Sequence, residues 1–232
     1  MHKYGFHSRT QHEHNESLAR HKATFLNAGR DGSIVFGEAM KEVHTGTTTV
    51  GIRGKDYVVL AADKRATMGY FVASKKAKKI IPITDNVALT IAGAVGDAQF
   101  IARLLRAEIN YYKARSGQEP NVKQMAHYLN VILNSSRYFP YYVQFLLGGV
   151  VDESELYSID LIGGITDEIY ASTGSGSPLA YAIIEEGYKE GMSAEEAAAL
   201  AKRAIETAMK RDVGTGEGVD VLIITKEGYK WL

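Results

Sequence analysis

The chain has 232 residues with 45% hydrophobic content, and its 27 Lys and Arg residues balance 27 Asp and Glu residues. This length and composition suit one domain with a full core, and the zero net charge gives no electrostatic reason to expect nucleic acid or an acidic membrane surface as a partner. The absence of cysteine excludes disulfide bonds, thiolate zinc sites and a cysteine nucleophile.

The first 46 residues form a polar leader that carries six of the seven histidines. This leader has no sustained period of two or of 3.6 residues, so we expect at most local folding there. His12-Glu13-His14 suggests a metal site, but no scaffold around it would fix a ligand geometry, and we expect no metal. The leader also lacks the apolar stretch of a signal peptide, and no run in the chain reaches the roughly 20 apolar residues of a membrane span. We therefore expect a cytoplasmic protein with a removable pro-segment.

Strand patterns dominate the first part of the chain after the leader. Four predicted strands cover residues 47–52, 57–62, 78–83 and 87–93, and a less regular loop covers residues 65–73. Asp63 ends the second of these strands and Lys79 begins the third. Short turns such as Gly54-Lys55-Asp56 join consecutive strands, so we expect an antiparallel meander.

The period changes to that of a helix after Gly96-Asp97. The predicted elements from there are helices 100–116 and 122–133, strands 141–151, 155–163 and 168–172, helices 178–190 and 193–210, and strands 219–225 and 229–232. Because the helices come in pairs between groups of strands, an alternating parallel sheet is excluded. The order predicts an α+β fold, a four-layer αββα sandwich of two antiparallel sheets between two helix pairs.

Elimination leaves a threonine as the candidate nucleophile. A Ser-His-Asp triad or a histidine-ligated zinc would need His127, the one histidine after the leader, and it sits in the middle of a predicted helix. The Gly174-Ser175-Gly176 loop lacks the lysine of a phosphate loop and the context of a nucleophile elbow. Thr47, if freed by cleavage after Gly46, could use its own amine as base, since a free α-amino group has a pKa near 7.7–8. The alternative is that residues 47–49 are ordinary strand residues.

Two ionisable residues end up where core residues would be expected. Asp63 follows five apolar residues, and Lys79 directly precedes Ile80-Ile81. A single charge at a strand end is usually solvated. An aspartate and a lysine on strands beside a nucleophile form a more specific pattern, because the cation lowers nearby pKa values and the carboxylate fixes the lysine.

Several motifs together resemble one known family. In chain order they are Thr47-Thr48-Thr49-Val50-Gly51-Ile52, Ala62-Asp63-Lys64-Arg65, Lys78-Lys79, Ile91-Ala92-Gly93-x-x-Gly96-Asp97, Ala171-Ser172-Thr173-Gly174-Ser175-Gly176-Ser177 and Lys210-Arg211-Asp212. In order and spacing they resemble the proteasome β subunit, particularly the archaeal type. The resemblance covers essentially everything after the leader and implies the N-terminal nucleophile hydrolase fold.

The resemblance implies a role for each matching residue. Thr47 would be the nucleophile of a threonine endopeptidase, released by autocatalytic cleavage of the Gly46–Thr47 bond, with its freed amine as general base. Asp63 and Lys79 would be the charged pair that tunes it. The backbone N–H of Gly93 would donate to the oxyanion that forms during the reaction.

The resemblance also implies a second polar group and a substrate-binding surface. Ser175 and Asp212 would lie around the threonine amine together with Thr215, which stands where the family has a serine. Thr67 and Gly93 would hold substrate as an added strand. The pocket for the residue before the cut bond would be formed by Ala66, Ala77, Ile81, Ile91, Val95 and Gln99. That set is uncharged, so we expect cleavage after hydrophobic residues.

Assembly is likewise an implication of the resemblance. It implies a homoheptameric β ring stacked on proteasome α rings, a regulatory ATPase acting through the α ring, unfolded polypeptides as substrates and no cofactor. Residues 1–46 would be the propeptide and residues 47–232 the catalytic domain. Two other interpretations stay open at this point: a non-catalytic ring subunit, and a different N-terminal nucleophile hydrolase that acts as an amidase on small molecules.

Overall fold

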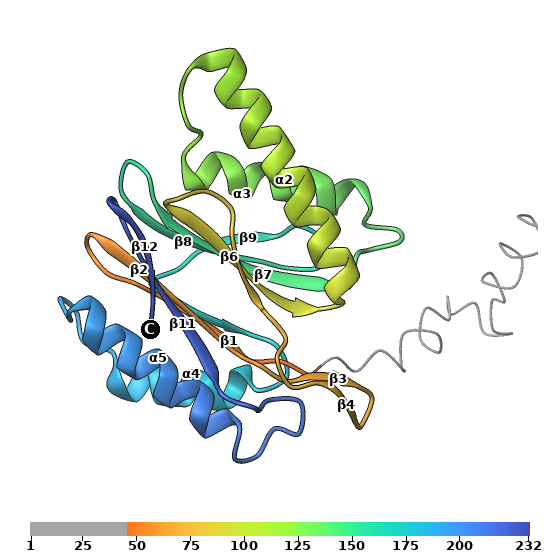
Figure 1. Cartoon of the computed structure of the whole chain (residues 1–232), viewed down its shortest axis with the longest axis vertical. Coiled ribbons are helices and arrows are strands. Elements are labelled where there is room, and N and C mark those ends of the chain that lie inside the picture. The colour runs from red at the N-terminus through yellow and green to blue at the C-terminus, as the bar shows by residue number, and fades with distance from the viewer. Residues whose placement is uncertain (1–45) are drawn as a thin grey trace, which may run out of the picture. The chain divides into compact units, whose positions relative to one another are not determined.

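Two five-stranded antiparallel sheets face each other in the structure, a computed structural model of the chain that describes residues 46–232 (Figure 1). A pair of helices covers the outer face of each sheet. This arrangement is the αββα sandwich that the order of helices and strands predicts. The histidine-rich segment and all of the expected propeptide except Gly46 lie outside the described residues. Within residues 46–232, no helix is long and apolar enough to cross a membrane.

The first sheet contains the first strand of the described chain, β1, as an interior strand next to the central strand β2. Its strand order is β10-β1-β2-β11-β12, with bounds Tyr170–Thr173, Thr49–Arg53, Tyr57–Asp63, Val219–Thr225 and Gly228–Trp231. All seven residues of β2 are buried, because the strand has a neighbour on each side, helices on one face and the second sheet on the other. The hydrophobic run of residues 58–62 reflects this position.

The second sheet is a meander in which consecutive strands are neighbours. Its order is β5-β6-β7-β8-β9, with bounds Ile80–Pro82, Val87–Gly93, Val143–Val150, Ser154–Ile159 and Ile165–Asp167. The expected single meander through the first half is wrong, because β1 and β2 belong to one sheet while β5 and β6 belong to the other. Lys79 lies just before β5 rather than beginning it. Strand β9, a short edge strand, was not predicted.

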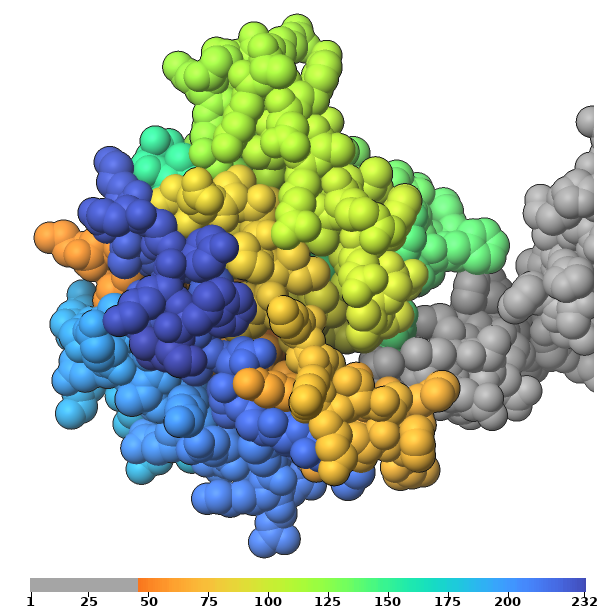
Figure 2. Space-filling model, viewed as in Figure 1, coloured from red at the N-terminus to blue at the C-terminus, as the bar shows by residue number. Residues whose placement is uncertain are grey.

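A small separate hairpin occupies the region that the sequence suggested was an irregular loop. Strands β3 (Ala66–Met68) and β4 (Phe71–Ser74) pair around a turn at Gly69, which has a φ of +60° that glycine adopts without strain. The hairpin lies at the surface in Figure 2. The side chain of Tyr70 at its tip is 92% exposed.

The helix pairs follow the predicted positions with shifted ends. Helices α2 (Val95–Ser116) and α3 (Val122–Ser135) cover the second sheet, and α4 (Ser177–Gly187) and α5 (Ala194–Ala208) cover the first (Figure 1). The predicted capping box is confirmed, since Ser193 and Glu196 bond each other's backbone N–H groups at the start of α5. Helix α2 begins before Asp97, whose carboxylate accepts the backbone N–H of Tyr142.

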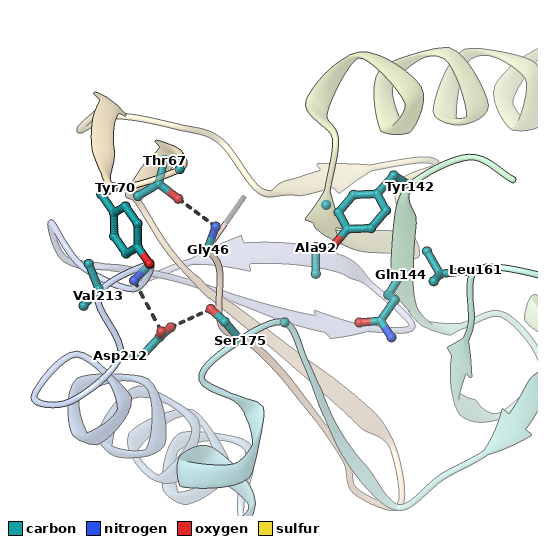
Figure 3. Close-up of a pocket in the computed structure, with 14 residues that line it drawn as sticks. Gly46, Thr67, Tyr70, Ala92, Tyr142, Gln144, Leu161, Ser175, Asp212 and Val213 are labelled. Carbon is teal, nitrogen blue, oxygen red and sulfur yellow. Dashed lines mark hydrogen bonds between the residues drawn. The ribbon is translucent and has the colours of Figure 1, made fainter. Parts of the chain in front are cut away.

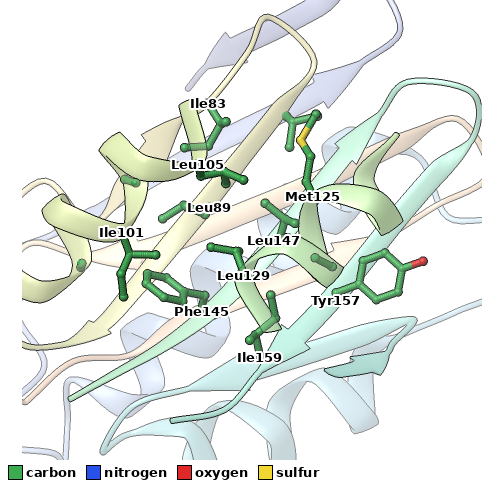
Figure 4. Packing of buried hydrophobic residues seen from close by; sticks show 14 of the residues in the cluster. Ile83, Leu89, Ile101, Leu105, Met125, Leu129, Phe145, Leu147, Tyr157 and Ile159 are labelled. Carbon is green, nitrogen blue, oxygen red and sulfur yellow. The ribbon is translucent and has the colours of Figure 1, made fainter. Parts of the chain in front are cut away.

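Three apolar layers hold the sandwich together. Figure 4 shows the layer between the second sheet and its helices, where Leu89, Phe145 and Leu147 of the sheet pack against Leu105 and Leu129 of the helices. A second layer, between the first sheet and its helices, consists mostly of alanine on the helix side, which lets α5 pack closely on the strands. The third layer lies between the two sheets. Truncating a buried leucine to alanine in such layers costs about 2–5 kcal/mol.

Candidate active site

Thr47 lies just before strand β1 with its side chain turned inward, and the residue is only 3% exposed. Its hydroxyl donates to the carbonyl oxygen of Gly46 at 2.6 Å, and its backbone N–H donates to Ser175 Oγ at 3.2 Å. The N–H of Gly46 donates to Thr67 Oγ1 at 2.7 Å. The peptide bond between Gly46 and Thr47 is therefore fixed on both sides, with the threonine hydroxyl next to its carbonyl group.

Asp63 and Lys79 form a buried ion pair beside Thr47. Lys79 Nζ donates to Asp63 Oδ1 at 2.7 Å, and the two side chains are 5% and 0% exposed. The same Oδ1 accepts the N–H of Thr48 at 3.0 Å, while Oδ2 accepts the N–H groups of Arg65 and Gly216, each at 3.0 Å. Four donors therefore surround the carboxylate, so both of its oxygens have hydrogen-bond partners inside the protein.

Burial sets the protonation behaviour of Lys79. Loss of water around the ammonium lowers its pKa below the usual 10.5, and the neighbouring charge of Asp63 opposes that shift without cancelling it. Lys79 is therefore a lysine with a lowered pKa whose anionic partner, Asp63, also binds the backbone N–H of the residue after Thr47.

A second polar group approaches Thr47 from the other side. Ser175, in the loop between β10 and α4, donates to Asp212 Oδ2 at 2.7 Å. Thr215 donates to the same carboxylate oxygen from the loop between α5 and β11. Gly174 has a φ of +91°, and a Cβ there would lie 2.1 Å from the carbonyl oxygen of Thr47. Glycine at this position therefore lets the Ser175 loop approach the threonine backbone.

The Ser175 side of this arrangement borders a pocket of about 420 Å³ (Figure 3). The residues that line it do not include Thr47, Asp63, Lys79 or Thr215. Ser175 and Asp212 lie on one side of it, and Tyr142, Gln144 and Leu161 lie on the other. The remaining lining residues are Gly46, Thr67, Gly69, Tyr70, Ala92, Gly93, Gly174, Val213 and Gly214. The only ionisable carboxylate among the lining residues is that of Asp212, so the pocket surface is mostly uncharged.

Gly93 ends strand β6 at the pocket. Its φ is +123°, and a Cβ there would lie 2.1 Å from the carbonyl oxygen of Tyr142. The N–H of Ile91 donates to the carbonyl of Lys79 on the β5 side. Because N–H groups of alternate strand residues point to the same edge, that of Gly93 points past the start of β5.

Comparison of the chain with known protein families shows the family to which it belongs. The family model described as proteasome subunit matches residues 43–224. The chain belongs to the proteasome subunit family. A proteasome subunit beta of Archaeoglobus profundus is 53% identical over 84% of this chain and 92% of its own length. Proteasome subunit beta 2 of Thermococcus gammatolerans is 54% identical over 82% and 96%, and that of Aeropyrum pernix is 44% identical over 90% and 95%.

The comparison confirms three sequence-based interpretations. The resemblance to proteasome β subunits is confirmed, and with it the α+β sandwich of that family and the general class of activity, that of a peptidase subunit. The other interpretations of the sequence, a small-molecule amidase and a purely structural protein, receive no support from these relatives.

The structure brings together most of the residues to which the resemblance assigned chemistry. Thr47 has Asp63 and Lys79 on one side and Ser175 on the other, with Asp212 and Thr215 behind Ser175. Gly93 and Thr67 line the pocket next to them.

The six residues assigned to the hydrophobic subsite do not line this pocket. Ile91 is 3% exposed and packs in the core between the second sheet and its helices, whereas the side chain of Val95 is 43% exposed at the start of α2. Ile81 packs partly against the same core as Ile91. The others are Ala66 in β3, Ala77 before β5 and Gln99 in α2.

Sequence reasoning missed several residues at the site. Tyr142, Gln144 and Leu161 line the pocket from β7 and the segment after β8, and no motif marks them. Arg65 was quoted only as part of a motif, yet its guanidinium donates to the carbonyl of Val213 at 2.8 Å. It thereby ties the end of β2 to the loop that carries Asp212.

His127, which the sequence raised as a possible catalytic base or zinc ligand, does not line this pocket. His127 is exposed on α3, far along the chain from the loops that carry the site. Among residues 46–232 there is no group of three His, Cys, Asp or Glu side chains placed to hold a metal ion.

Proposed function

We propose that this proteasome-family chain is a threonine-type endopeptidase subunit in which Thr47 is the nucleophile. The observation that carries the proposal is the position of Thr47 between two polar groups. On one side, Asp63 of the Asp63–Lys79 pair accepts the N–H of the next residue, Thr48. On the other side, Ser175 Oγ accepts the backbone N–H of Thr47. When its amine is freed, Thr47 would carry a general base within the same residue, so its hydroxyl would need no base from another side chain.

Release of the leader is the first step that we propose. The Thr47 hydroxyl lies 2.6 Å from the carbonyl oxygen of Gly46 and so next to the carbonyl carbon. Addition of the hydroxyl oxygen to that carbon, protonation of the nitrogen and cleavage of the C–N bond would convert the amide into an ester. Water would then hydrolyse the ester, giving a Gly46 carboxylate and a free Thr47 amine. Residues 1–46 would be the propeptide, and residues 47–232 the catalytic domain.

Substrate hydrolysis would use the freed amine. The amine takes the hydroxyl proton while Thr47 Oγ1 attacks the substrate carbonyl carbon, and it then gives a proton to the departing amine. Lys79, held by Asp63, would favour the deprotonated hydroxyl through its positive charge. The N–H of Gly93, next to Ala94 whose own N–H is bonded to the Tyr142 carbonyl, would donate to the oxyanion. Water would hydrolyse the resulting ester and restore the enzyme.

Substrate would bind as an extended strand between Thr67 of the β3–β4 hairpin and Gly93 at the end of β6, both of which line the pocket. The subsite for the residue before the cut bond would lie outside the pocket of Figure 3, because none of the uncharged set named from the sequence lines that pocket. Cleavage after hydrophobic residues is the preference that follows. This set comprises Ala66, Ala77, Ile81, Ile91, Val95 and Gln99.

The names of the relatives support an assembled enzyme. We propose a homoheptameric β ring stacked on proteasome α rings, with a regulatory ATPase that acts through the α ring and delivers unfolded polypeptides. We place this assembly in the cytoplasm. The exposed aromatic side chains of Tyr111 and Tyr138 are candidate contacts between subunits.

The proposal is tested with Thr47→Ala and a matched control, Thr49→Val, each produced with the α-type subunit of the same organism. We expect Thr47→Ala to keep its leader and to hydrolyse no peptide, because both reactions need the hydroxyl. The control removes a buried hydroxyl two residues further along the chain and should keep both activities. Peptide hydrolysis by assembled Thr47→Ala would contradict the proposal. An inactive wild-type particle would instead favour a structural ring subunit.

A further inference from the structure

A connected set of hydroxyl groups, buried at Thr48 and Thr215 and exposed at Ser175, leads from Thr48 to the carboxylate of Asp212 and on to Thr47. Thr48 Oγ1 lies 2.6 Å from Thr215 Oγ1, and Thr215 donates to Asp212 Oδ2. The same oxygen of Asp212 accepts the hydroxyl of Ser175 at 2.7 Å, and Ser175 Oγ lies 3.2 Å from the backbone nitrogen of Thr47. The side chain of Thr48 is thus the far end of a connected set that ends at the nitrogen of its neighbour in the sequence.

The direction of the hydrogen bonds follows from counting protons. A hydroxyl has one proton to donate, and Thr215 donates its proton to the carboxylate of Asp212. Thr48 must therefore be the donor to Thr215. Both threonines are 0% exposed, so no bulk water can replace a lost partner. The Thr48 hydroxyl fixes the orientation of the Thr215 hydroxyl, which in turn bonds the carboxylate.

Thr48 also contacts the other charged group of the site. Its backbone N–H donates to Asp63 Oδ1 at 3.0 Å, and Asp63 is the partner of Lys79. One residue therefore connects to the Lys79 pair through its backbone and to Asp212 through its side chain. The place for its hydroxyl is kept open by Gly176, where a Cβ would lie 2.1 Å from Thr48 Oγ1.

We propose that Thr48 is a positioning residue whose hydroxyl holds Thr215, and through it Asp212, in place beside the Thr47 amine. This inference rests on the function proposed above, since the amine exists only after the Gly46–Thr47 bond is cut. The carboxylate of Asp212 favours the protonated amine through Ser175. Without the Thr48 hydroxyl the carboxylate is held less firmly, and the amine is less well placed to accept and return its proton.

The inference is tested with Thr48→Val and Thr48→Ser in the assembled particle. Valine keeps the shape of the side chain and removes the hydroxyl, whereas serine keeps the hydroxyl and removes a methyl group. The control is Thr49→Val, which removes one hydroxyl from a separate buried set, in which Thr49 Oγ1 lies 2.7 Å from Thr173 Oγ1 and 3.1 Å from Thr90 Oγ1. Intact mass establishes for each variant that the chain begins at Thr47.

We expect Thr48→Val to lower kcat about tenfold with little change in KM. The missing hydrogen bond belongs to the charged network that positions the amine for the reaction, and it makes no contact with substrate. The acidic limb of its kcat–pH profile should move to lower pH, since the amine loses part of the stabilisation of its protonated form while Asp63, Lys79 and Arg65 are unchanged. Thr48→Ser should regain most of the rate and the original profile. Thr49→Val should match the wild type.

Three outcomes would overturn the inference. One is a Thr48→Val enzyme as fast as Thr49→Val, and another is a loss that Thr48→Ser does not restore. The third is an equal loss for Thr48→Val and Thr49→Val with unchanged pH profiles, which would show a packing effect. If Thr48→Val alone keeps its leader while Thr48→Ser loses it, the need for the hydroxyl is supported. Activity that survives Thr47→Ala would refute the proposed function itself. The Thr48 variants test only the positioning role of Thr48, so the two hypotheses can fail independently.

Discussion

Lys79 Nζ and Asp63 Oδ1 are 2.7 Å apart in a part of the protein where neither side chain is more than 5% exposed. The two partners are not equivalent. Asp63 accepts three backbone N–H groups in addition to the ammonium, from Thr48, Arg65 and Gly216. The carboxylate therefore joins three segments of the chain, whereas the lysine supplies mainly a charge.

This asymmetry predicts that Asp63→Ala destabilises the subunit more than Lys79→Ala. Removing Asp63 leaves the buried N–H groups of Thr48 and Gly216 without an acceptor, each at a cost of about 1–3 kcal/mol, and also frees the partly buried N–H of Arg65. Removing Lys79 leaves the carboxylate with those three donors. Thermal unfolding of the two variants should show a lower melting temperature for Asp63→Ala, while both lose most peptidase activity. Equal melting temperatures would show that the backbone contacts of Asp63 contribute little.

Lys79 should also set the alkaline limit of activity. Burial lowers its pKa from 10.5, so its positive charge is lost at a lower pH than that of a free lysine. If the charge assists Thr47, kcat falls as the pH rises through this lowered pKa. Lys79→Arg keeps its charge to higher pH. Where that variant retains measurable activity, its alkaline limb should lie at higher pH than that of the wild type, and coincident limbs would assign the limit to another group.

Gly93 is expected to tolerate no side chain. Gly93→Ala would place a methyl group 2.1 Å from the carbonyl oxygen of Tyr142 at a φ of +123°. Strain at such a backbone conformation costs about 1–3 kcal/mol before the clash is added. We expect a lower melting temperature and loss of hydrolysis. Gly96→Ala is the control, because no atom lies within 4 Å of a Cβ at that position in helix α2. Similar behaviour of the two variants would mean that the backbone at Gly93 can shift freely.

The sequence predicted much of this site and fold in two ways, through local patterns and through the family resemblance. Asp63 and Ser193 are marked by local patterns, an acidic residue after five apolar ones and a capping box, and local patterns depend only on neighbours in the chain. The placement of Ser175 and Asp212 came from the resemblance, since their 2.7 Å contact joins loops 37 residues apart in the sequence.

The failures concern how distant segments meet. The approach of Gly93 to Tyr142 depends on the register between β6 and β7, which pairs Gly93 with Val143, and no short motif reports that register. The separation of β1–β2 from β5–β6 into two sheets likewise depends on the β3–β4 hairpin that intervenes. The predicted start of helix α2, residue 100, is later than the observed start at Val95, because Gly96-Asp97 resembles a turn. In the structure Asp97 lies within the helix and its carboxylate accepts the backbone N–H of Tyr142.

Thr215 stands where the resemblance implies a serine, and we expect the difference to affect packing more than chemistry. Its hydroxyl bonds Asp212 and Thr48, and the residue is 0% exposed. Thr215→Ser keeps both bonds and removes a buried methyl group, which costs about 1 kcal/mol. The melting temperature should fall slightly and kcat should stay within about twofold of the wild type. Thr215→Val, the matched control without a hydroxyl, should lose activity. A large loss of kcat in Thr215→Ser would show that the methyl group itself positions the hydroxyl.

The most direct test of the central claim is the intact mass of the purified protein, produced together with its α-type partner and isolated as an assembled particle. Cleavage of the Gly46–Thr47 bond creates the amine on which the proposed mechanism depends. We expect the mass of a chain that begins at Thr47. A full-length mass in a fully assembled particle would contradict the account, because Thr47 would then have no free amine to act as its base.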